Sequence, residues 1–374
     1  MNLIYIANSR IPTEKAHGLQ IVKMCEAFSN YSEEVQLIIP KRKNDINEDI
    51  FSYYQTKDNF KIKKINSFDF YQYWEYLGKL SFWLQSFSFA IRLLFMKADK
   101  KSIIYTRDPE IGWLFSLRGY KTVYEAHTWP ENRRWLYKFL IRKIKKIITI
   151  SYGLKGAFIS AGCPENNILV APDGVDLEEF GIKISAAEAR RKLKLPLDKK
   201  IIMYTGHLYE WKGAQILADA ADLLENDSVT VFVGGTEHDL KKFKKINSGR
   251  KNILIIGYVK HEKIPYYLKA ADILVLPNSA KEKIFSRYTS PLKLFEYMSA
   301  NRPIVASDLP SIREVLNENN CVLVEPDNPA SLANGIKKIL ENKIFAEAIA
   351  KQALIDIKNF SWSRRAESII NFMN

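Results

Sequence analysis

Short apolar runs alternate along this chain with longer segments in which apolar residues recur every three or four positions. The short runs are rich in β-branched side chains, as buried strands of a parallel sheet are, whereas the longer segments have the period of an amphipathic helix. In the first half the predicted strands are residues 3–7, 35–39, 102–106, 121–125, 147–150 and 168–171, and the main predicted helices are 19–30, 77–96 and 135–144.

The second half repeats this alternation. Strands that alternate with helices predict parallel sheets covered by helices on both faces, so each half has the pattern of a doubly wound, Rossmann-like α/β fold. The predicted strands are residues 201–205, 229–233, 253–256, 273–277, 303–306 and 321–324, and the predicted helices are 214–224, 264–270, 291–300, 312–316 and 329–340.

The length of the chain agrees with two domains, because 374 residues exceed what one ordinary core organises. A polar, lysine-rich stretch over residues 181–200 separates the two series of elements and is the expected hinge. We predict an N-terminal, acceptor-binding domain over 1–180 and a C-terminal domain over 181–359, with a closing helix over 360–374 that packs back on the first. Ligands of such folds bind at the carboxyl ends of the strands, here expected to line an interdomain cleft.

Missing motifs exclude several chemistries. The first strand is not followed by the G-x-G-x-x-G dinucleotide fingerprint, and the chain has no G-x-x-x-x-G-K-[ST] phosphate loop, which argues against an oxidoreductase and a P-loop nucleotidase. It also has no H-E-x-x-H, paired C-x-x-C, G-x-S-x-G or D-x-D motif. We therefore expect neither a metal nor a cofactor.

Charge and cysteine usage bear on partners and location. Lys and Arg number 56 against 42 Asp and Glu, and the net charge of +14 implies anionic partners. The three cysteines lie far apart without metal-site spacing, which favours reduced thiols. The chain enters its first strand directly after Met1-Asn2, so we expect no signal peptide and a cytoplasmic location.

Two segments bear on whether the protein contacts an anionic membrane surface. We expect the protein to associate peripherally with the inner face of the membrane. The basic segment from Arg133 to Lys146 has apolar residues at helical spacing, which is typical either of a helix lying on lipid or of a core-packed helix with a solvated basic face. Residues 70–96 are crowded with aromatic side chains, but charged residues interrupt them too often for a membrane span. We favour a buried helix there over an interfacial one near a lipid-linked substrate.

The stretch from Ser290 to Met298 has the pattern of a helix that begins at an anion. Ser290 is a good N-cap, Pro291 suits the first helical position, and the free amides that follow, including that of Leu292, form a phosphate site with the helix dipole. Glu296 would lie roughly 5–8 Å further along the axis, where a carboxylate reaches the ribose of a nucleotide. The alternative is an ordinary capped helix with Glu296 solvated.

A second segment also has the pattern of a phosphate site at the start of a helix. The predicted strand 201–205 ends at Gly206 and leads through His207 and Lys212 into the helix 214–224. A strand, a glycine turn and a helix start place backbone amides and two potential cations around a phosphate. Alternatively, Lys212 is a surface lysine and His207 an ordinary loop residue.

With these motifs in view, the chain resembles the family-4 retaining glycosyltransferases of the GT-B fold along nearly its full length. The motifs occur in the family's order: Gly18 after the first strand, Tyr124-Glu125-Ala126-His127, Ala171-Pro172-Asp173-Gly174-Val175-Asp176, Thr205-Gly206-His207-Leu208 with Lys212-Gly213, Ser290 to Met298 followed by Asn301-Arg302-Pro303-Ile304-Val305-Ala306-Ser307, and Trp362 in the closing helix.

The resemblance implies transfer of a sugar from a UDP- or GDP-sugar to a hydroxyl of a glycan or lipid-linked acceptor in polysaccharide or glycoconjugate biosynthesis, with retention and without a metal. It implies that the leaving diphosphate itself takes the acceptor proton. By this resemblance, the diphosphate would be bound by Lys212, His207, Gly206, Gly18 and the amides around Ser290, Pro291 and Leu292. The ribose would be bound by Glu296 and the base by the backbone at Tyr258 and Val259. The donor sugar would be contacted by His127.

Three positions depart from the family pattern. His207 stands where arginine is usual, and Asp173 stands where asparagine is usual. Tyr288 occupies the place of the first glutamate of the family's E-x7-E pair, and Glu282 is not at the matching position. The identity of the donor sugar is therefore open.

Other functions compete with this one. His17, just after the first strand, could serve an inverting transferase as general base. The missing glutamate fits a catalytically silent sugar-nucleotide-binding protein. Basic charge with aromatics would also suit a nucleic-acid-binding protein, but no nucleic-acid module is recognisable, so we expect no nucleic-acid partner.

Overall fold

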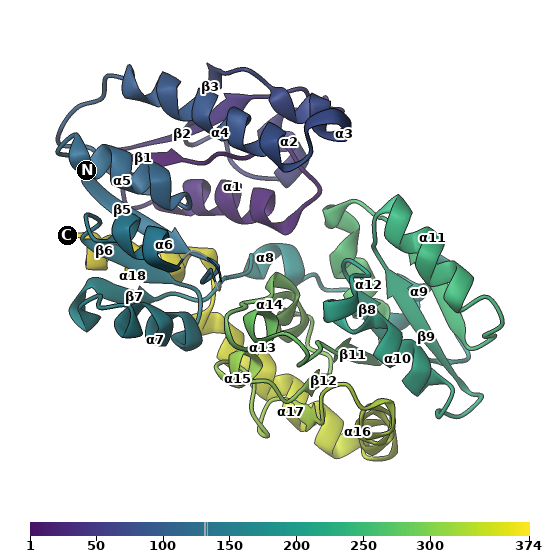
Figure 1. The fold of residues 1–374 in the computed structure, drawn as a ribbon. Coiled ribbons are helices and arrows are strands. Elements are labelled where there is room, and N and C mark those ends of the chain that lie inside the picture. The colour runs from purple at the N-terminus through teal and green to yellow at the C-terminus, as the bar shows by residue number, and fades with distance from the viewer. Residues whose placement is uncertain (131, 133) are drawn as a thin grey trace. The chain divides into compact units, whose positions relative to one another are not determined.

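The computed structural model describes residues 1–130, 132 and 134–374, so Arg133 of the basic segment lies outside the described residues, as do the side chains of Tyr71 and Trp74 in the aromatic segment. The chain folds into two compact units (Figure 1). Unit 1 comprises Met1–Ile150, Leu154–Pro172 and Trp362–Asn374, and unit 2 comprises Ser151–Gly153 and Asp173–Ser361.

Unit 1 is built on a seven-stranded parallel sheet with the order β3-β2-β1-β4-β5-β6-β7. Its inner strands are short, almost entirely buried apolar runs, as a sheet covered on both faces requires. The strands are β1 (Asn2–Ile6), β2 (Glu34–Lys41), β3 (Lys61–Asn66), β4 (Ile103–Thr106), β5 (Lys121–Ala126), β6 (Lys146–Thr149) and β7 (Ile168–Val170).

Helices cover both faces of this sheet, with α1 on one side and α4 on the other (Figure 1). The last helix, α18, returns to this unit and packs beside α1. The helices are α1 (Ala16–Phe28), α2 (Ile50–Tyr54), α3 (Trp74–Leu77), α4 (Lys79–Leu94), α5 (Pro109–Leu117), α6 (Arg134–Ile141), α7 (Tyr152–Ser160) and α18 (Trp362–Met373), with a 3-10 turn η1 (Phe70–Tyr73) before α3.

Unit 2 repeats the plan with a six-stranded parallel sheet in the order β10-β9-β8-β11-β12-β13. The strands are β8 (Lys200–Thr205), β9 (Ser228–Val233), β10 (Ile253–Gly257), β11 (Ile273–Leu276), β12 (Ile304–Ser307) and β13 (Val322–Val324). The helices are α8 (Leu177–Phe180), α9 (Ala186–Leu193), α10 (Ala214–Ala221), α11 (Glu237–Ile246), α12 (Ile264–Ala270), α13 (Lys283–Arg287), α14 (Leu292–Ser299), α15 (Pro310–Arg313), α16 (Pro329–Glu341) and α17 (Lys343–Asp356).

The strand order reverses once in each sheet, between β1 and β4 in unit 1 and between β8 and β11 in unit 2. Open parallel sheets bind ligands outside the carboxyl ends of the strands at such a reversal. The residues that follow these four strands are therefore the first candidates for a site.

The predicted doubly wound sheets are confirmed, and all twelve predicted strands correspond to observed ones within a residue or two. One strand, β3, is not predicted by the apolar pattern. Its sequence is Lys-Ile-Lys-Lys-Ile-Asn, and it lies at the edge of the sheet with three lysines. Edge strands carry such charges because these discourage pairing with another chain.

The aromatic segment differs most from its prediction. A break at Gly78, with φ +51°, divides it into α3 and α4. Only Ser81, Gln85, Phe89 and Leu93 of α4 are buried, so the predicted buried helix is wrong for most of its apolar side chains. No helix in the described part of the chain is both long and apolar enough to cross a membrane.

In the basic segment, α6 buries only Leu140 and Ile141. Its Trp135 and Phe139 are exposed, although they stand at apolar positions of the helix. Of the two interpretations of this segment, core packing therefore holds for only one end of α6.

Candidate functional site

The candidate site of unit 2 lies where β8 and β11 end. Gly206 follows β8 with φ +123°, a conformation that glycine adopts without strain. A Cβ on Gly206 would lie 3.6 Å from the amine of Lys293, so that amine lies directly beside this turn. Thr205, the last residue of β8, donates its amide to the Tyr297 hydroxyl at 2.8 Å, which fixes α14 against the end of the strand.

The turn that carries Lys212 is fixed against β11. Gly213 has φ +73°, and a Cβ there would lie 1.6 Å from the Pro277 carbonyl oxygen, so only glycine fits. The amide of Ser279 donates to the Trp211 carbonyl at 3.1 Å. The backbone around Lys212 is therefore held against the carboxyl end of β11, at the reversal of the strand order.

Lys212 has a strongly perturbed environment. Its amine lies 4.0 Å from the centre of the Trp211 ring and makes no hydrogen bond or ion pair with any described residue. Burial lowers its pKa from 10.5 to about 8. Keeping a desolvated cation without a counter-charge costs folding free energy. Such a state is expected of a group whose counter-charge is supplied by an anionic ligand.

Lys293, which the sequence analysis does not single out, is the second such cation. Its side chain is 8% exposed, and its amine has no hydrogen-bond acceptor within the described parts of the chain. The amine lies 3.7 Å from the centre of the Tyr204 ring. Burial lowers its pKa well below the usual range, and the charge of Lys212 lowers it further while Glu296 opposes the shift.

A signal for Lys293 does exist in the sequence. It is the second residue of α14, where the helix dipole disfavours a cation, and every other residue from Leu292 to Phe295 is apolar. A lysine in the first turn of a buried helix is favourable only if an anion binds beside it.

The start of α14 is a correction to the sequence analysis. The helix begins at Leu292, so Pro291 occupies the N-cap position in place of Ser290. No side chain caps the first amides of the helix. The Ser290 hydroxyl instead accepts a hydrogen bond from the Asp173 amide at 2.9 Å. The first amides of the helix, at Leu292 and Lys293, have no intrahelical acceptor and are left for a ligand.

Glu296 is buried on α14, as a ribose ligand would be, but its carboxylate already has a partner. His261 Nε2 lies 3.1 Å from Glu296 Oε1, and His261 Nδ1 lies 3.1 Å from Glu179 Oε1 on α8. Burial alone would lower the pKa of His261, yet the hydrogen bonds to Glu179 and Glu296 raise it to about 10. The imidazolium therefore fixes one oxygen of Glu296 and leaves the other.

The remaining predicted residues of unit 2 lie in two places. His207 follows Gly206, and its ring stacks on Tyr209 with 4.9 Å between the centroids and 9° between the planes. Tyr258 and Val259 follow β10, two strands away from β8 on the same edge, with Tyr258 56% exposed and Val259 packed against the core. Glu282 is exposed at the start of α13.

The candidate residues of unit 1 centre on Glu125, at the end of β5. Its fully buried carboxylate accepts from Gln20 at 2.6 Å, from the Tyr105 hydroxyl and from His127 Nε2 at 2.5 Å, and it lies 3.3 Å from the Arg365 guanidinium on α18. Burial would raise the pKa of Glu125, but Arg365 and His127 hold it well below the usual range.

This network fixes His127. Burial and the charge of Arg107 lower the pKa of His127 to about 4, so the ring is neutral near pH 7. A neutral ring hydrogen-bonded to a carboxylate donates its Nε2 proton, which leaves Nδ1 as an acceptor. The sequence motif identifies His127, but only the fold reveals that Glu125 and Arg365 hold it.

Gly18 and His17 lie in the first turn of α1. The expectation that Gly18 lies in the loop after β1 is wrong, and its amide donates to the Lys15 carbonyl at 3.0 Å. A Cβ on Gly18 would lie 2.2 Å from the Tyr54 hydroxyl, so tight packing explains the glycine. Burial, with the charges of Arg107 and Lys15, lowers the pKa of His17 to about 4.

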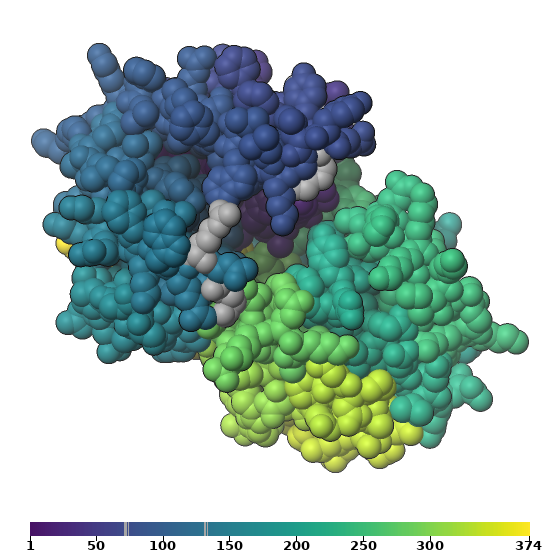
Figure 2. All heavy atoms as spheres, in the orientation of Figure 1, coloured from purple at the N-terminus to yellow at the C-terminus, as the bar shows by residue number. Residues whose placement is uncertain are grey.

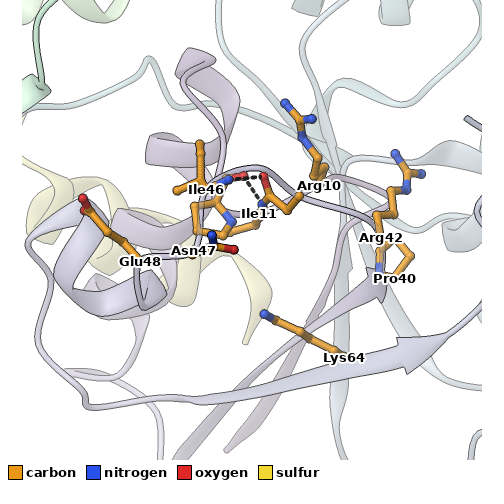
Figure 3. A pocket seen from close by; sticks show the side chains of 10 residues that line it. Arg10, Ile11, Pro40, Arg42, Ile46, Asn47, Glu48 and Lys64 are labelled. Atoms are coloured by element: carbon orange, nitrogen blue, oxygen red, sulfur yellow. Dashed lines mark hydrogen bonds between the residues drawn. The ribbon is translucent and has the colours of Figure 1, made fainter. Parts of the chain in front are cut away.

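A separate pocket of about 260 Å³ opens in unit 1 beside the carboxyl ends of β1, β2 and β3. Three of its lining side chains are cations, Arg10, Arg42 and Lys64, against a single carboxylate, Glu48. Arg10 and Arg42 lie side by side, whereas Glu48 is on the opposite side and points away from them (Figure 3). The pocket is therefore suited to an anion.

Within the described residues, no three or more His, Cys, Asp or Glu side chains are grouped to hold a metal ion.

Two protein-family models match the chain. The one described as Glycosyltransferase Family 4 matches residues 21–179, and the one described as Glycosyl transferases group 1 matches residues 185–355. Together they cover most of both units.

Curated relatives match over part of the chain. An uncharacterized glycosyltransferase of Methanocaldococcus jannaschii is 27% identical over 237 residues, which are 60% of this chain and 59% of that protein. A UDP-Gal:alpha-D-GlcNAc-diphosphoundecaprenol alpha-1,3-galactosyltransferase of Escherichia coli is 30% identical over 195 residues, 47% of this chain and 46% of that protein. The matches span less than two thirds of the length of the first curated relatives.

Solved structures match the whole fold. The Anabaena protein HepE in complex with UDP-glucose superimposes with a TM-score of 0.76 at 17% identity, covering 99% of this chain and 98% of that one. At this identity the likeness concerns the fold alone.

Proposed function

The chain belongs to the family 4 glycosyltransferases and has the GT-B fold, and from that premise we propose that it transfers a sugar from a UDP- or GDP-sugar to a hydroxyl group with retention of configuration. The bond between the anomeric carbon and the diphosphate oxygen breaks, and a bond between that carbon and the acceptor oxygen forms. The nucleoside diphosphate leaves and takes the proton of the acceptor hydroxyl, so no metal and no separate base are needed.

One observation carries this proposal: two lysines, the buried Lys293 and the half-buried Lys212, lie without an ion-pair partner among the described residues beside Gly206 and the start of α14. Charge develops on the leaving diphosphate during transfer, and fixed cations and amides in a water-poor site stabilise it most. Two desolvated ammonium groups and two free helix amides match a diphosphate in charge and in number of donors.

The other residues of unit 2 fit the same donor. Glu296, with one oxygen held by His261, presents the other to the ribose hydroxyls, and the backbone at Tyr258 and Val259 holds the base. His207 adds a weaker donor than the arginine usual in the family, and Lys293 compensates for it. Ser290 contributes only through its backbone, because Asp173 engages its hydroxyl.

In unit 1 we assign a contact with the donor sugar to His127. A neutral imidazole held by Glu125 offers a sugar hydroxyl a fixed acceptor at Nδ1. Gly18 is assigned to the packing of α1 rather than to the diphosphate, because its amide is already bonded.

An inverting mechanism that uses His17 as the base fits less well. Its pKa of about 4 makes the imidazole a weak proton acceptor near pH 7, whereas an effective base has a pKa near the working pH. A catalytically silent binding protein is favoured only by Tyr288 in place of the family's first glutamate.

The acceptor is proposed to be a hydroxyl of a glycan or lipid-linked molecule in polysaccharide or glycoconjugate biosynthesis, as the printed name of the Escherichia coli relative supports. Exposed Trp135 and Phe139 on the basic helix α6 support association with an anionic membrane surface in the cytoplasm.

The test is an assay of donor consumption with a panel of UDP- and GDP-sugars, followed by proton NMR of the product anomer. We expect one donor class to be consumed and the product to keep its anomeric configuration. Lys212→Ala should lose about 2–4 kcal/mol of transition-state stabilisation, roughly 10²–10³ in turnover. An inverted product, or no consumption of any donor, would refute the proposal.

A further inference from the structure

The segment that follows β11 in unit 2 contains a buried asparagine whose side-chain oxygen has no partner. Asn278 is 1% exposed, and its Oδ1 accepts no hydrogen bond from any described residue. Helix α13, which follows a few residues later, lies at the surface, in the light-green part of the space-filling view (Figure 2). Burying an amide oxygen without a hydrogen bond costs folding free energy, so the position of Asn278 needs a reason.

Asn278 lies opposite Lys212 across two segments of backbone. The carbonyl oxygen of the residue before Asn278 lies 1.6 Å from the place that a Cβ on Gly213 would occupy. The residue after Asn278 donates its amide to the Trp211 carbonyl at 3.1 Å. The two chain neighbours of Asn278 therefore contact the two chain neighbours of Lys212, which brings the asparagine to the turn that carries this cation.

The loop that carries Asn278 is also fixed further along the chain. The Ala280 amide donates to Asp327 Oδ2 at 2.8 Å. The ring of Phe285 on α13 stacks on Trp211, with 4.0 Å between the centroids and 5° between the planes. A fixed loop that leaves a buried oxygen without a donor is typical of a site preorganised for a ligand.

The residue that stands in place of the family's first glutamate does not supply a carboxylate for the donor sugar. Tyr288 is used in packing, because its Cδ1 lies 3.4 Å from the place that a Cβ on Gly153 would occupy, within unit 2. Glu282 is exposed. Asn278, in the same loop, is buried beside the Lys212 turn and has an oxygen still to be satisfied.

Asn278 and Lys212 require complementary groups from a ligand. The Lys212 ammonium group has no counter-charge among the described residues, and Asn278 Oδ1 has no donor. A fully ionised phosphate satisfies the lysine but has no proton to donate to the amide oxygen. A sugar diphosphate satisfies both, because its phosphate binds the ammonium group while a sugar hydroxyl donates to the oxygen.

We propose that Asn278 is a specificity-determining residue for the donor sugar, and that its Oδ1 accepts a hydrogen bond from a hydroxyl of the hexose whose diphosphate binds at Lys212. This inference rests on the proposed function, because it assigns a further residue to the same donor. It selects a hexose with a free hydroxyl at the position that Asn278 contacts, and it disfavours a sugar that is deoxygenated there.

The first test compares nucleotides with nucleotide sugars by calorimetric titration into the full chain. The ligands are UDP, GDP, UDP-glucose, UDP-galactose, UDP-N-acetylglucosamine and GDP-mannose, and the proteins are wild type and Asn278→Leu, which has a similar volume and no acceptor. The nucleotide sugar that wild type binds most tightly should lose about five- to tenfold in affinity in the variant. The affinity for its parent nucleoside diphosphate should not change. An unchanged affinity for the nucleotide sugar would overturn the proposal.

The second test asks whether a hydroxyl is the group that Asn278 contacts. Analogues of the same nucleotide sugar carry fluorine in place of one hydroxyl at a time, and fluorine cannot donate a hydrogen bond. Wild type should bind one analogue about five- to tenfold more weakly than the parent, whereas Asn278→Leu should bind the two equally. Losses of the same size in both proteins would show that no hydroxyl donates to Asn278.

Unfolding of the ligand-free protein in urea separates a binding role from a structural one. Asn278→Leu should unfold at the same or a higher urea concentration than wild type, because the substitution removes an amide oxygen that the fold leaves unsatisfied. The matched control is Asn320→Leu, at a residue that is also 1% exposed but accepts from the Asn317 amide at 2.8 Å and donates to Asp356 at 2.9 Å. This control should unfold at a lower concentration. A midpoint as low for Asn278→Leu would mean that Asn278 serves the fold, and would overturn the proposal.

The same titrations distinguish this inference from the proposed function. If wild type binds a nucleotide sugar and Asn278→Leu binds it equally well, the assignment of Asn278 fails and the proposed function stands. The same holds if wild type binds UDP or GDP but none of the four nucleotide sugars more tightly than its parent nucleotide. If wild type binds neither the nucleotides nor the nucleotide sugars, the proposed function itself fails.

Discussion

Lys212 and Lys293 carry the proposed chemistry of unit 2 at the scale of single residues. Desolvation lowers the pKa of each ammonium group, and no carboxylate forms an ion pair with either one in the described structure. A diphosphate would reverse that shift, because a nearby negative charge favours the protonated amine. Donor binding is therefore expected to be coupled to proton uptake.

The pH dependence of binding follows from Lys212. Its pKa of about 8 in the free protein means that above pH 8 the amine must first take up a proton, so the affinity for UDP should fall by up to about tenfold per pH unit. Between pH 7 and 8 it should change little. Calorimetric titrations from pH 7 to 10 measure this, and Lys212→Arg, which stays charged, should show a shallower decline, because only Lys293 then has to take up a proton. An affinity independent of pH in wild type would contradict the assignment.

His261 makes a second prediction, about stability. Its folded-state pKa of about 10 lies above the ordinary 6.5, because Glu179 and Glu296 hold the imidazolium. The stabilisation is therefore complete below pH 6.5 and is lost as the pH rises through 10. The difference in unfolding free energy between wild type and His261→Gln should shrink over this range in urea titrations. A difference that stays constant would exclude the imidazolium bridge.

The sequence predicts part of this site. Gly206 and Lys212 are predicted from the strand-turn-helix pattern and Glu296 from the helix start at Ser290, and all three lie near Lys293 in the structure. Lys293 is missed because its role depends on burial beside Gly206, a contact between distant segments. The cap predicted at Ser290 is wrong because Asp173, 117 positions earlier, takes its hydroxyl.

At the scale of elements, glycines fix the turns that carry these residues. Gly213 places the Lys212 turn against the end of β11, where a side chain would collide with the Pro277 carbonyl. The position of Lys212 is thus set by backbone packing, not by the flexible side chain.

Gly213→Ala should destabilise the protein by about 2–5 kcal/mol, from the left-handed backbone and the clash together. Gly249→Ala is the matched control, since a Cβ there meets nothing within 4 Å. Urea unfolding of both variants measures the effect. Equal stabilities would show that the turn can move away from β11.

Gly18 allows a double-variant test of the first turn of α1. Gly18→Ala should cost about 1–4 kcal/mol, because the new methyl group displaces the Tyr54 hydroxyl from its hydrogen bonds to the backbone of Thr13. Removing that hydroxyl with Tyr54→Phe should make the alanine less costly. Gly156→Ala in α7, with open space around it, should be neutral or slightly stabilising. Strict additivity of the two substitutions in unfolding free energy would disprove the contact.

Elements are predicted well where one face is apolar and poorly where the pattern is inverted. The strands of both sheet interiors are found because they are continuous apolar runs. The edge strand β3 is missed because lysines interrupt it, and α4 is assigned to the core because its many aromatics are counted without knowing that they face outward.

At the scale of the whole molecule, alternation of strands and helices is enough to predict two doubly wound units. The return of the last helix rests on a buried ion pair that no local pattern reveals: Arg365 on α18 with Glu125 on β5, at 3.3 Å. The same pair holds His127, so the end of the chain supports a site residue formed more than two hundred positions earlier.

That ion pair yields a prediction for the full chain. Arg365→Met should destabilise unit 1 by about 3–5 kcal/mol, because it leaves the Glu125 carboxylate buried without its partner. Adding Glu125→Gln should recover part of the loss, measured by urea unfolding. A double variant that loses the sum of both single losses would show that the pair is not coupled.

The central claim is that unit 2 binds a nucleoside diphosphate through Lys293 and Lys212 at the start of α14. Calorimetric titration of UDP and GDP into wild type, Lys293→Met and the control Lys351→Met tests it most directly. The account predicts binding of at least one of the two by wild type and by the control, and a loss in Lys293→Met of about 1.5–3 kcal/mol, roughly 10- to 150-fold. No binding of either nucleotide by wild type, or wild-type affinity in Lys293→Met, would contradict it.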